Sequence, residues 1–366
     1  MSVFRNVYNG KKVFITGHTG FKGAWLTQWL LDLGAEVAGY SVDIPTNPSL
    51  FEDLSLSKEI DHHIGDVRNI EELSSKIENF DPDFLFHLAA QALVRDSYDD
   101  PVGTFATNAI GTANVLNSIR NCGKLKAAVF VTTDKVYENF EWPYGYREND
   151  RIGGNDPYSA SKGAAEIIFH SFYRSFFNSD SCPKIASARA GNVIGGGDWA
   201  KDRIIPDAVR AWKNGESLVI RNPKSTRPWQ HVLEPIGAYL WLAAEMTHRK
   251  EINGEAFNFG PPPEVNQSVE ALLSSMMEKW PGSKWVVEDQ CAENKHEAGQ
   301  LKLNCDKAHG QLGWYPCLSF EDTLEFTSEW YQKVGSDNNL AKEITKNQIE
   351  SYTKIARREK IHWAMV

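Results

Sequence analysis

Short apolar runs alternate with stretches of helical periodicity along the first 190 residues. The apolar runs, rich in β-branched and aromatic residues, predict strands at residues 12–16, 36–41, 84–88, 127–133 and 185–190. Amphipathic patterns at residues 24–33 and 110–120 predict helices, and a further helix is expected to begin near Tyr158. Strands that alternate with helices predict an α/β fold with a doubly wound parallel sheet, whose ligand lies at the carboxyl ends of the strands.

The pattern changes after residue 190. Residues 191–229 are rich in Gly, Pro, Trp and Arg and have no clear period, whereas a short helix, a strand near Trp285 and a polar helical tail are expected after Pro261. We predict a large domain at residues 1–190, to which the chain returns at about 231–260. A smaller C-terminal substrate-binding domain is predicted at residues 191–230 and 261–340, followed by a helical tail at residues 341–366. The charged run at residues 357–360 is expected to be a solvated helix face.

Composition restricts the classes of function. The chain has 366 residues, 42% hydrophobic and 24% charged, as in a globular enzyme, and its formal net charge of −9 argues against a nucleic-acid-binding surface. No apolar run reaches the ~18–20 residues of a membrane span, and the polar N-terminus lacks the apolar region of a signal peptide. The five cysteines are scattered without metal-ligand spacing, so we expect free thiols, no metal site and a cytoplasmic location.

A glycine-rich segment separates the first predicted strand from the first predicted helix. Its spacing, GxxGxxG, is typical of a Rossmann dinucleotide-binding turn when it lies between a strand and a helix. Glycine lets the backbone approach a pyrophosphate, whose charge meets the helix N-terminus. The segment that we expect to bind the cofactor is Gly17-His18-Thr19-Gly20-Phe21-Lys22-Gly23.

The residues after the second predicted strand suggest which dinucleotide binds. Asp43 follows the last glycine by about 20 residues, as a ribose contact should. No Lys or Arg between residues 39 and 50 would attract a 2′-phosphate, so NAD is predicted rather than NADP. Asp66 and Val67 are expected in a turn at the adenine edge, and His62 and His63 are expected at the surface.

Tyr158 and Lys162 lie four residues apart at the start of a predicted helix and therefore share one helical face. A neighbouring ammonium lowers the pKa of a phenol. The pair thus predicts a phenolate that takes the proton of an alcohol while hydride leaves the carbon for a nicotinamide. Pro157 before the pair and the strand that ends at Thr132-Thr133 make the motif more specific.

With these motifs the chain resembles the extended short-chain dehydrogenase/reductase family, and within it the nucleotide-sugar 4,6-dehydratases, most narrowly the branch that acts on CDP-glucose. The matching segments lie at residues 17–23, 87–91, 132–135, 158–162, 189–199 and 227–231, and the resemblance covers roughly residues 11–314. It implies oxidation of a hexose at C4 by NAD, loss of water from C5 and C6, and return of hydride to C6, in deoxysugar biosynthesis. It also implies a homodimer, paired through the helices near residue 158 and at 110–120.

The resemblance gives individual residues their roles. Thr133 would bind the sugar O4, Tyr158 would be the base for the C4 hydroxyl, and Lys162 would hold the nicotinamide ribose. Asp134 would be the acid for the C6 hydroxyl, which requires that burial raise its pKa. Lys135 departs from the pattern, because dTDP-glucose dehydratases have a glutamate there as the C5 base. Further cofactor contacts are expected from Leu88, Ala89, Ala90, Thr107 and Thr132.

Two roles are open for Lys135. Burial beside Lys162 and the nicotinamide could lower its pKa until it acts as a neutral base at C5. Alternatively, Lys135 only stabilises the enolate, and water or Asp134 transfers the proton.

The segment after residue 190 supplies candidate substrate contacts. A diphosphate needs fixed bidentate donors, which guanidinium groups provide. Arg203 and Arg221 are equally consistent with surface residues, whereas Arg227 lies in a matching motif. By resemblance, the substrate contacts are Gln91 near the hexose and Asn192, Arg203, Arg221, Arg227 and His296 near the diphosphate. The nucleotide base, CDP, rests on the resemblance alone.

Two other functions are compatible with a dinucleotide site. A nucleotide-sugar 4-epimerase would share the oxidation at C4, but it needs no acid or base at C5 and C6, so Asp134 and Lys135 argue against it. A non-catalytic dinucleotide-sensing protein would be expected to have lost Tyr158 or Lys162, and both are present.

Overall fold

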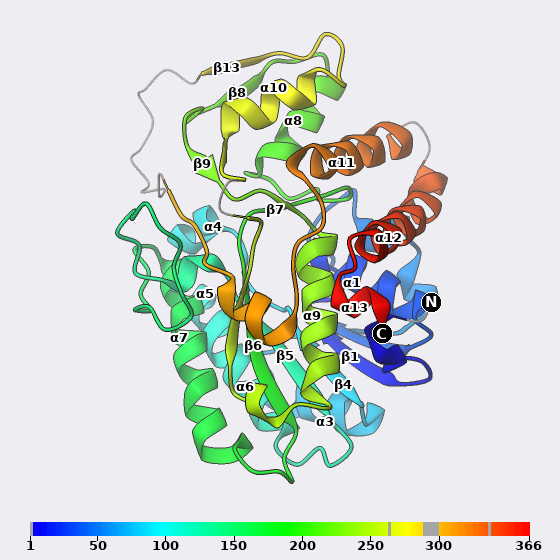
Figure 1. Cartoon of the computed structure of the whole chain (residues 1–366), viewed down its shortest axis with the longest axis vertical. Helices are drawn as coiled ribbons and strands as arrows, with labels where there is room; N and C mark the ends of the chain where they lie inside the picture. Colours follow the sequence, from blue (N-terminus) through cyan, green and yellow to red (C-terminus); the bar gives the residue numbers. More distant parts are fainter. Residues whose placement is uncertain (1–2, 263–264, 288–299, 336–337) are drawn as a thin grey trace.

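The computed structural model describes residues 3–262, 265–287, 300–335 and 338–366. Within these residues, one parallel sheet has the strand order β11-β6-β5-β4-β1-β2-β3 (Figure 1). Its strands are β1 (Lys12–Thr16), β2 (Glu36–Ser41), β3 (Asp61–Ile64), β4 (Phe84–His87), β5 (Ala127–Val131), β6 (Lys184–Ala190) and β11 (Ala256–Phe259). The predicted doubly wound parallel sheet is confirmed.

Both faces of the sheet are buried because successive residues of each strand point to opposite sides. In β1, Val13 and Ile15 contribute to one apolar cluster, and Phe14 contributes to another. The first cluster contains α1 (Phe21–Asp32) and α9 (Leu233–Met246), with α12 (Ala341–Arg358) packed on α1. The second contains α3 (Ile70–Phe80), α6 (Gly111–Ile119) and α7 (Pro157–Phe172).

Helix α1 differs from the amphipathic helix that the sequence predicts. Trp25 and Trp29 are buried as expected, but Thr27 and Gln28 are buried as well. The C-terminal segment causes this difference, because α12 and α13 (His362–Met365) pack beside α1 (Figure 1). Trp363 of α13 stacks on Phe4 with ring centroids 4.8 Å apart. The charged run at residues 357–360 is exposed on α12 and beyond, as predicted.

The remaining elements form a smaller part of the molecule, at the top of Figure 1. Its helices are α8 (Ile204–Lys213), α10 (Val269–Met277) and α11 (Phe320–Val334). Its short strands pair as β8 (Leu218–Ile220) with β13 (Trp285–Val287), β9 (Thr226–Arg227) with β12 (Gln267–Ser268), and β7 (Val193–Ile194) with β10 (Gln230–His231).

One apolar cluster runs through both parts of the molecule. It includes Ile205 of α8 and Leu272 of α10 together with Val129 of β5. The chain also returns to the main sheet at β11, which pairs with β6. The predicted domain limits stay a prediction, since no break in packing marks them. Among the described residues, no helix combines the length and the apolar character that crossing a bilayer requires.

Candidate active site

A cavity of about 420 Å³ lies between the ends of the central strands and the smaller part of the molecule. Segments that follow β5 and β6, the start of α7, and the helix α4 (Val94–Asp99) line it. The predicted site residues in this lining are Lys22, Thr133, Asp134, Lys135, Tyr158, Asn192, Arg203, Arg221 and Arg227. The fold therefore brings residues from distant parts of the sequence to one cavity.

The turn between β1 and α1 fits a pyrophosphate. Gly17 has φ +79°, and a Cβ there would lie 2.6 Å from the Ala89 nitrogen. A Cβ at Gly23 would lie 2.1 Å from the Gly17 oxygen, whereas a Cβ at Gly20 would meet only that oxygen, at 3.5 Å. The turn is thus tightly packed at its base and open at Gly20. Among the described residues no side chain caps α1, so its first N–H groups are available to an anion.

His18 occupies the space between this turn and β2. Its ring packs on Gly39, where a Cβ would lie 2.3 Å from the ring. His18 Nδ1 is 2.9 Å from Ser41 Oγ, and Nε2 is 2.7 Å from His62 Nδ1. Burial, and then the neighbouring His62, lowers the pKa of His18 to about 3, so the ring is neutral. The prediction that His62 is a surface residue is wrong, because it is half-buried against His18.

The predicted adenosine contacts lie near the turn. Asp43 is exposed after β2, and its carbonyl accepts a hydrogen bond from the Thr19 hydroxyl at 2.7 Å. The Asp66 carboxylate accepts one from Arg68 Nε at 2.8 Å, and Val67 is buried. Their contacts with a ribose or an adenine stay predictions.

The remaining predicted cofactor residues follow β4 and β5. Leu88, Ala89, Ala90 and Thr107 are half-buried. The Thr132 hydroxyl donates to Glu166 Oε1 at 2.6 Å, so its proton is not available for a cofactor contact.

The Tyr158 phenol is buried in the first turn of α7. Asp156 caps this helix by accepting from the Ser159 N–H at 2.9 Å, and Ser97 of α4 accepts from the Tyr158 N–H at 3.2 Å. Burial raises the pKa of Tyr158 to about 12, although hydrogen bonding with Thr133 and the charge of Arg203 act in the opposite direction. The expected depression of the phenol pKa by Lys162 is therefore not what this structure shows, because desolvation of the phenol outweighs the nearby positive charges.

Lys162 is buried one helical turn after Tyr158. Its Nζ donates to the Val131 carbonyl at 3.2 Å. Burial lowers the pKa of Lys162 to about 8, and the negative charge of Glu166 partly opposes this shift. The pKa of Lys162 therefore lies close to neutral pH, where the group can gain or lose a proton.

Asp134 has the environment predicted for an acid. It is 1% exposed, and its Oδ1 accepts from the Thr133 hydroxyl at 3.0 Å. Its Oδ2 has no hydrogen-bond partner among the described residues. Burial raises the pKa of Asp134, while Lys135 and Thr133 pull it down less strongly. The predicted direction is confirmed.

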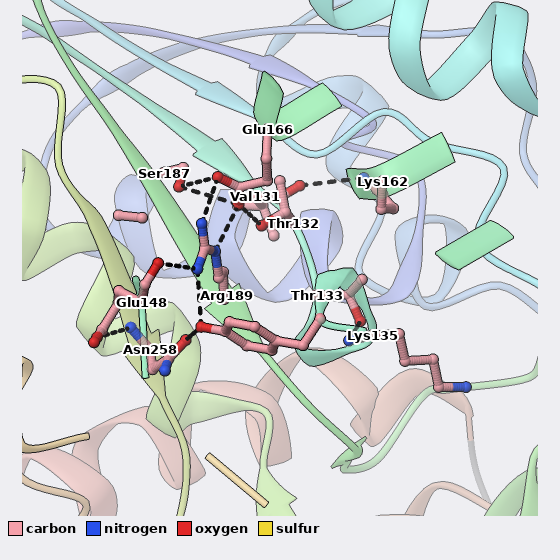
Figure 2. Close-up of polar contacts among 12 residues, drawn as sticks. Val131, Thr132, Thr133, Lys135, Glu148, Lys162, Glu166, Ser187, Arg189 and Asn258 are labelled. Atoms are coloured by element: carbon pink, nitrogen blue, oxygen red, sulfur yellow. Dashed lines mark hydrogen bonds and ion pairs between the residues drawn. The ribbon is translucent and has the colours of Figure 1, made fainter. Parts of the chain in front are cut away.

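Lys135 is half-buried, and Figure 2 shows its side chain running away from that of Lys162. The expectation of a lysine buried beside Lys162 is wrong, because the turn after β5 directs the two side chains apart. The charge of Lys135 instead acts on Asp134, whose pKa it lowers.

The predicted substrate residues divide into two groups. Arg203 is 2.9 Å from Asp198, Arg221 is 3.7 Å from Asp202, and Arg227 is 8% exposed, all in the cavity lining. Gln91, by contrast, is not in that lining: its amide donates to the Leu93 carbonyl and accepts from the Leu93 N–H. Its contact with a hexose stays a prediction, and His296 lies outside the described residues.

Sequence reasoning did not anticipate three features of the site. Lys22 was expected only at the cofactor, yet its side chain lines the cavity, where burial and then the charge of Arg203 lower its pKa to about 8. Helix α4 contributes Arg95 and Tyr98 to the lining, and its short pattern gave no signal. The third is a buried ion pair of Glu166 and Arg189. Its signal was present in the sequence, because Glu166 follows Lys162 by one helical turn.

Comparison of the sequence with known proteins shows which family the chain belongs to. The family model described as GDP-mannose 4,6 dehydratase matches residues 14–327. The chain belongs to this family. It is also 47% identical over 333 residues to the CDP-glucose 4,6-dehydratase of Salmonella typhimurium, a match that covers 90% of this chain and 92% of that protein. The resemblance to the dehydratase branch of the extended short-chain dehydrogenases/reductases is thereby confirmed.

Two solved structures of other proteins share the fold of this chain. An epimerase from Methanothermobacter thermautotrophicus superposes with a TM-score of 0.78 at 24% identity, covering 92% of this chain and 96% of that one. A dTDP-glucose 4,6-dehydratase from Bacillus anthracis, solved in complex with NAD, gives a TM-score of 0.74 at 21% identity, covering 90% and 98%.

Proposed function

We propose that this family member converts CDP-D-glucose to CDP-4-dehydro-6-deoxy-D-glucose with loss of water and with NAD as a resident cofactor. The observation that carries the proposal is one cavity that holds a phenol, a carboxyl of raised pKa and a lysine beside a dinucleotide turn. The choice of CDP-glucose draws on the 47% identity to a CDP-glucose 4,6-dehydratase.

The glycine turn and Lys162 would hold the cofactor. Gly20 offers an open backbone at the N-terminus of α1, and Lys162 lies one helical turn from Tyr158. When bound, NAD would accept hydride from the sugar C4 and return it to C6 in the last step. The cofactor therefore ends the reaction in its original oxidation state, and the net change in the sugar is the loss of one water.

Tyr158 would take the proton of the C4 hydroxyl while Thr133 holds the O4 atom. With a pKa near 12, the phenol is a strong base once ionised. The charge of Arg203 favours the ionised form that this step needs, although burial outweighs it. The C4 ketone that results makes the C5 proton acidic.

Asp134 would then give its proton to the C6 hydroxyl, which leaves as water. A carboxyl of raised pKa carries the proton that this step needs. The C5 proton would leave to water or to Asp134 while the charge of Lys135 stabilises the enolate, and the same group would return a proton to C5. Arg227, Arg203, Arg221 and Asn192 would hold the diphosphate, since all four line the cavity.

The purified enzyme should be tested on CDP-, dTDP-, UDP- and GDP-glucose in deuterated water, with NMR detection. We expect the 4-dehydro-6-deoxy product from CDP-glucose, with deuterium at C5. A C4 epimer without deuterium at C5 would identify an epimerase instead. Turnover of no sugar by an enzyme that binds NAD would favour a sensing role, and preferential turnover of another nucleotide would overturn the choice of CDP.

A homodimer and a cytoplasmic location complete the proposal. Val102, Ile110 and Ile167 are exposed apolar residues on α5 (Pro101–Phe105), the helical turn η3 (Ala106–Ile110) and α7, with exposures of 79%, 54% and 62%. A second copy of the chain would cover them, in line with the implied helix pairing. The cysteines within the described residues are free thiols, which fits a reducing compartment.

A further inference from the structure

A buried ion pair behind the cavity takes no part in the proposed chemistry (Figure 2). Glu166 on α7 and Arg189 on β6 both have side chains that are 0% exposed. Arg189 Nε donates to Glu166 Oε1 at 2.9 Å, and Nη2 donates to Oε2 at 3.0 Å. Burial alone would raise the pKa of Glu166, but Arg189 and the hydroxyl donors outweigh it and lower the pKa to about 2. The pair is therefore fully charged within the core.

The pair holds both ends of the catalytic turn at residues 133–136, which carries Thr133, Asp134 and Lys135. Thr132, directly before the turn, donates its hydroxyl to Glu166 Oε1 at 2.6 Å. Tyr137, directly after it, accepts from Arg189 Nη1 at 2.8 Å. Two residues that frame the reacting groups are thus bonded to one fixed pair of charges.

The same pair connects the turn to the other catalytic elements. Glu166 lies four residues after Lys162, on the face of α7 that also carries Tyr158. Arg189 lies two residues before Gly191, where a Cβ would be 2.1 Å from Asp134 Oδ2. Glu166 and Arg189 therefore connect β5, β6 and α7 close to the ends of these elements that line the cavity.

We propose that Glu166 and Arg189 are positioning residues that keep the turn at residues 133–136 in register with Tyr158 and Lys162. The O4-binding hydroxyl, the C4 base and the acid for C6 must all reach one sugar ring, and small displacements of reacting groups are costly in rate. The inference rests on the proposed function for the reaction itself. The placement of the turn can be measured independently of activity.

Removing either charge would leave the other buried without a partner, which destabilises the fold whether or not the pair positions the turn. Hydroxyl deletions avoid this difficulty. Thr132→Val and Tyr137→Phe each release one end of the turn. Ser187→Ala is the matched control, because Ser187 donates to the same carboxylate at 3.0 Å from the middle of β6, away from the turn. Thr132→Ser restores the hydroxyl.

We expect Thr132→Val and Tyr137→Phe each to lower kcat by about 10- to 100-fold, with KM and NAD affinity little changed. Ser187→Ala should lose comparable thermal stability but keep its kcat, and Thr132→Ser should recover most of the activity. By hydrogen–deuterium exchange, the amides of residues 132–137 should exchange roughly tenfold faster in the first two variants than in Ser187→Ala.

Equal kcat and equal exchange in Thr132→Val, Tyr137→Phe and Ser187→Ala would overturn the proposal, as would a Thr132→Ser variant that fails to recover. A wild-type enzyme that turns over none of the nucleotide sugars would contradict the proposed function instead. In that case the exchange of residues 132–137 decides the positioning role by itself.

Discussion

Burial favours the neutral forms of the Asp134 carboxyl, the Tyr158 phenol and the Lys162 amine. It raises the pKa of the first two and lowers the pKa of the third. Asp134 is thereby favoured in its proton-donating form and Lys162 in its neutral form, whereas the Tyr158 phenol needs positive charge nearby before it ionises. At the scale of single residues, withdrawal from water thus prepares the chemistry before any substrate binds.

Replacement of Asp134 by Asn should stop the reaction after oxidation at C4. Asn keeps the shape of the side chain but has no proton for the departing C6 hydroxyl. We expect product formation to fall by about 10²–10⁴-fold while reduced nicotinamide accumulates on the enzyme, as followed by its absorbance. Tyr158→Phe is the control, since it should block the oxidation and give no reduced nicotinamide. The same absorbance in both variants would contradict the separate roles of acid and base.

Gly191→Ala tests the position of the same acid without removing it. The new Cβ would lie 2.1 Å from Asp134 Oδ2, so the carboxyl must move. We expect a loss of turnover with accumulated reduced nicotinamide, as in Asp134→Asn. Gly123→Ala is a matched control, because a Cβ there meets nothing within 4 Å. Normal turnover by Gly191→Ala would show that the carboxyl need not occupy its observed place.

At the scale of elements, the central strands could be predicted because they are continuously apolar. Strand β3 could not, since Asp61–Ile64 is a polar edge strand that pairs only with β2 in the described sheet. The burial of all faces of α1 also escaped prediction, because it depends on α12, more than three hundred residues later. Patterns within a segment reveal local periodicity, whereas edge position and coverage depend on distant partners.

The site residues also divide into those that a local sequence pattern predicts and those that depend on how distant segments fold. Tyr158 and Lys162 were visible as an i, i+4 pair, and the glycine turn was visible from its spacing. The direction of Lys135 and the entry of Lys22 into the cavity depend on how the loops after β5 and β1 are folded, which spacing does not specify.

Strand β2 supports the glycine turn through His18, and Gly39→Ala tests this support. A Cβ on Gly39 would overlap the His18 ring, so the ring and its bonds to Ser41 and His62 must shift. Overpacking costs about 1–3 kcal/mol, and a displaced turn should raise the Kd for NAD by about tenfold or more. Titration with NAD by calorimetry would measure this change, with Gly123→Ala as the control. An unchanged Kd would mean that His18 does not hold the turn in place.

At the scale of the whole molecule, buried ionisable groups set the dependence of stability on pH. Burial lowers the pKa of His18, His87 and His231 to about 3 each. Since their ordinary pKa is 6.5, the stability that these neutral rings provide is complete above that pH and is lost as the pH falls toward 3. Because these histidines already make stability depend on pH, the contribution of one carboxyl to stability is measured by comparing a variant that lacks it with the wild type at each pH.

Glu234 provides such a comparison, because it joins three distant segments. Its Oε1 accepts from the N–H groups of Cys317 and Leu318 at 2.8 and 2.7 Å, and its Oε2 accepts from the Tyr352 hydroxyl at 2.7 Å. Burial raises its pKa from 4.5 to about 7. A carboxyl whose folded-state pKa is raised contributes stability below its unfolded pKa and loses it as the pH rises through 7.

Glu234→Gln should therefore become more stable relative to the wild type as the pH rises from 5 to 8. The amide keeps an acceptor for the two N–H groups and never ionises, so it escapes a loss of about 2.5 kcal/mol that the wild type suffers over this range. Urea unfolding at both pH values would measure the difference. Glu245→Gln, on the same helix, should instead lose stability at both, because it gives up the ion pair with Arg5 at 2.9 Å. If the difference between Glu234→Gln and the wild type stayed constant with pH, Glu234 would have to be ionised throughout and the three segments would be held around a buried charge.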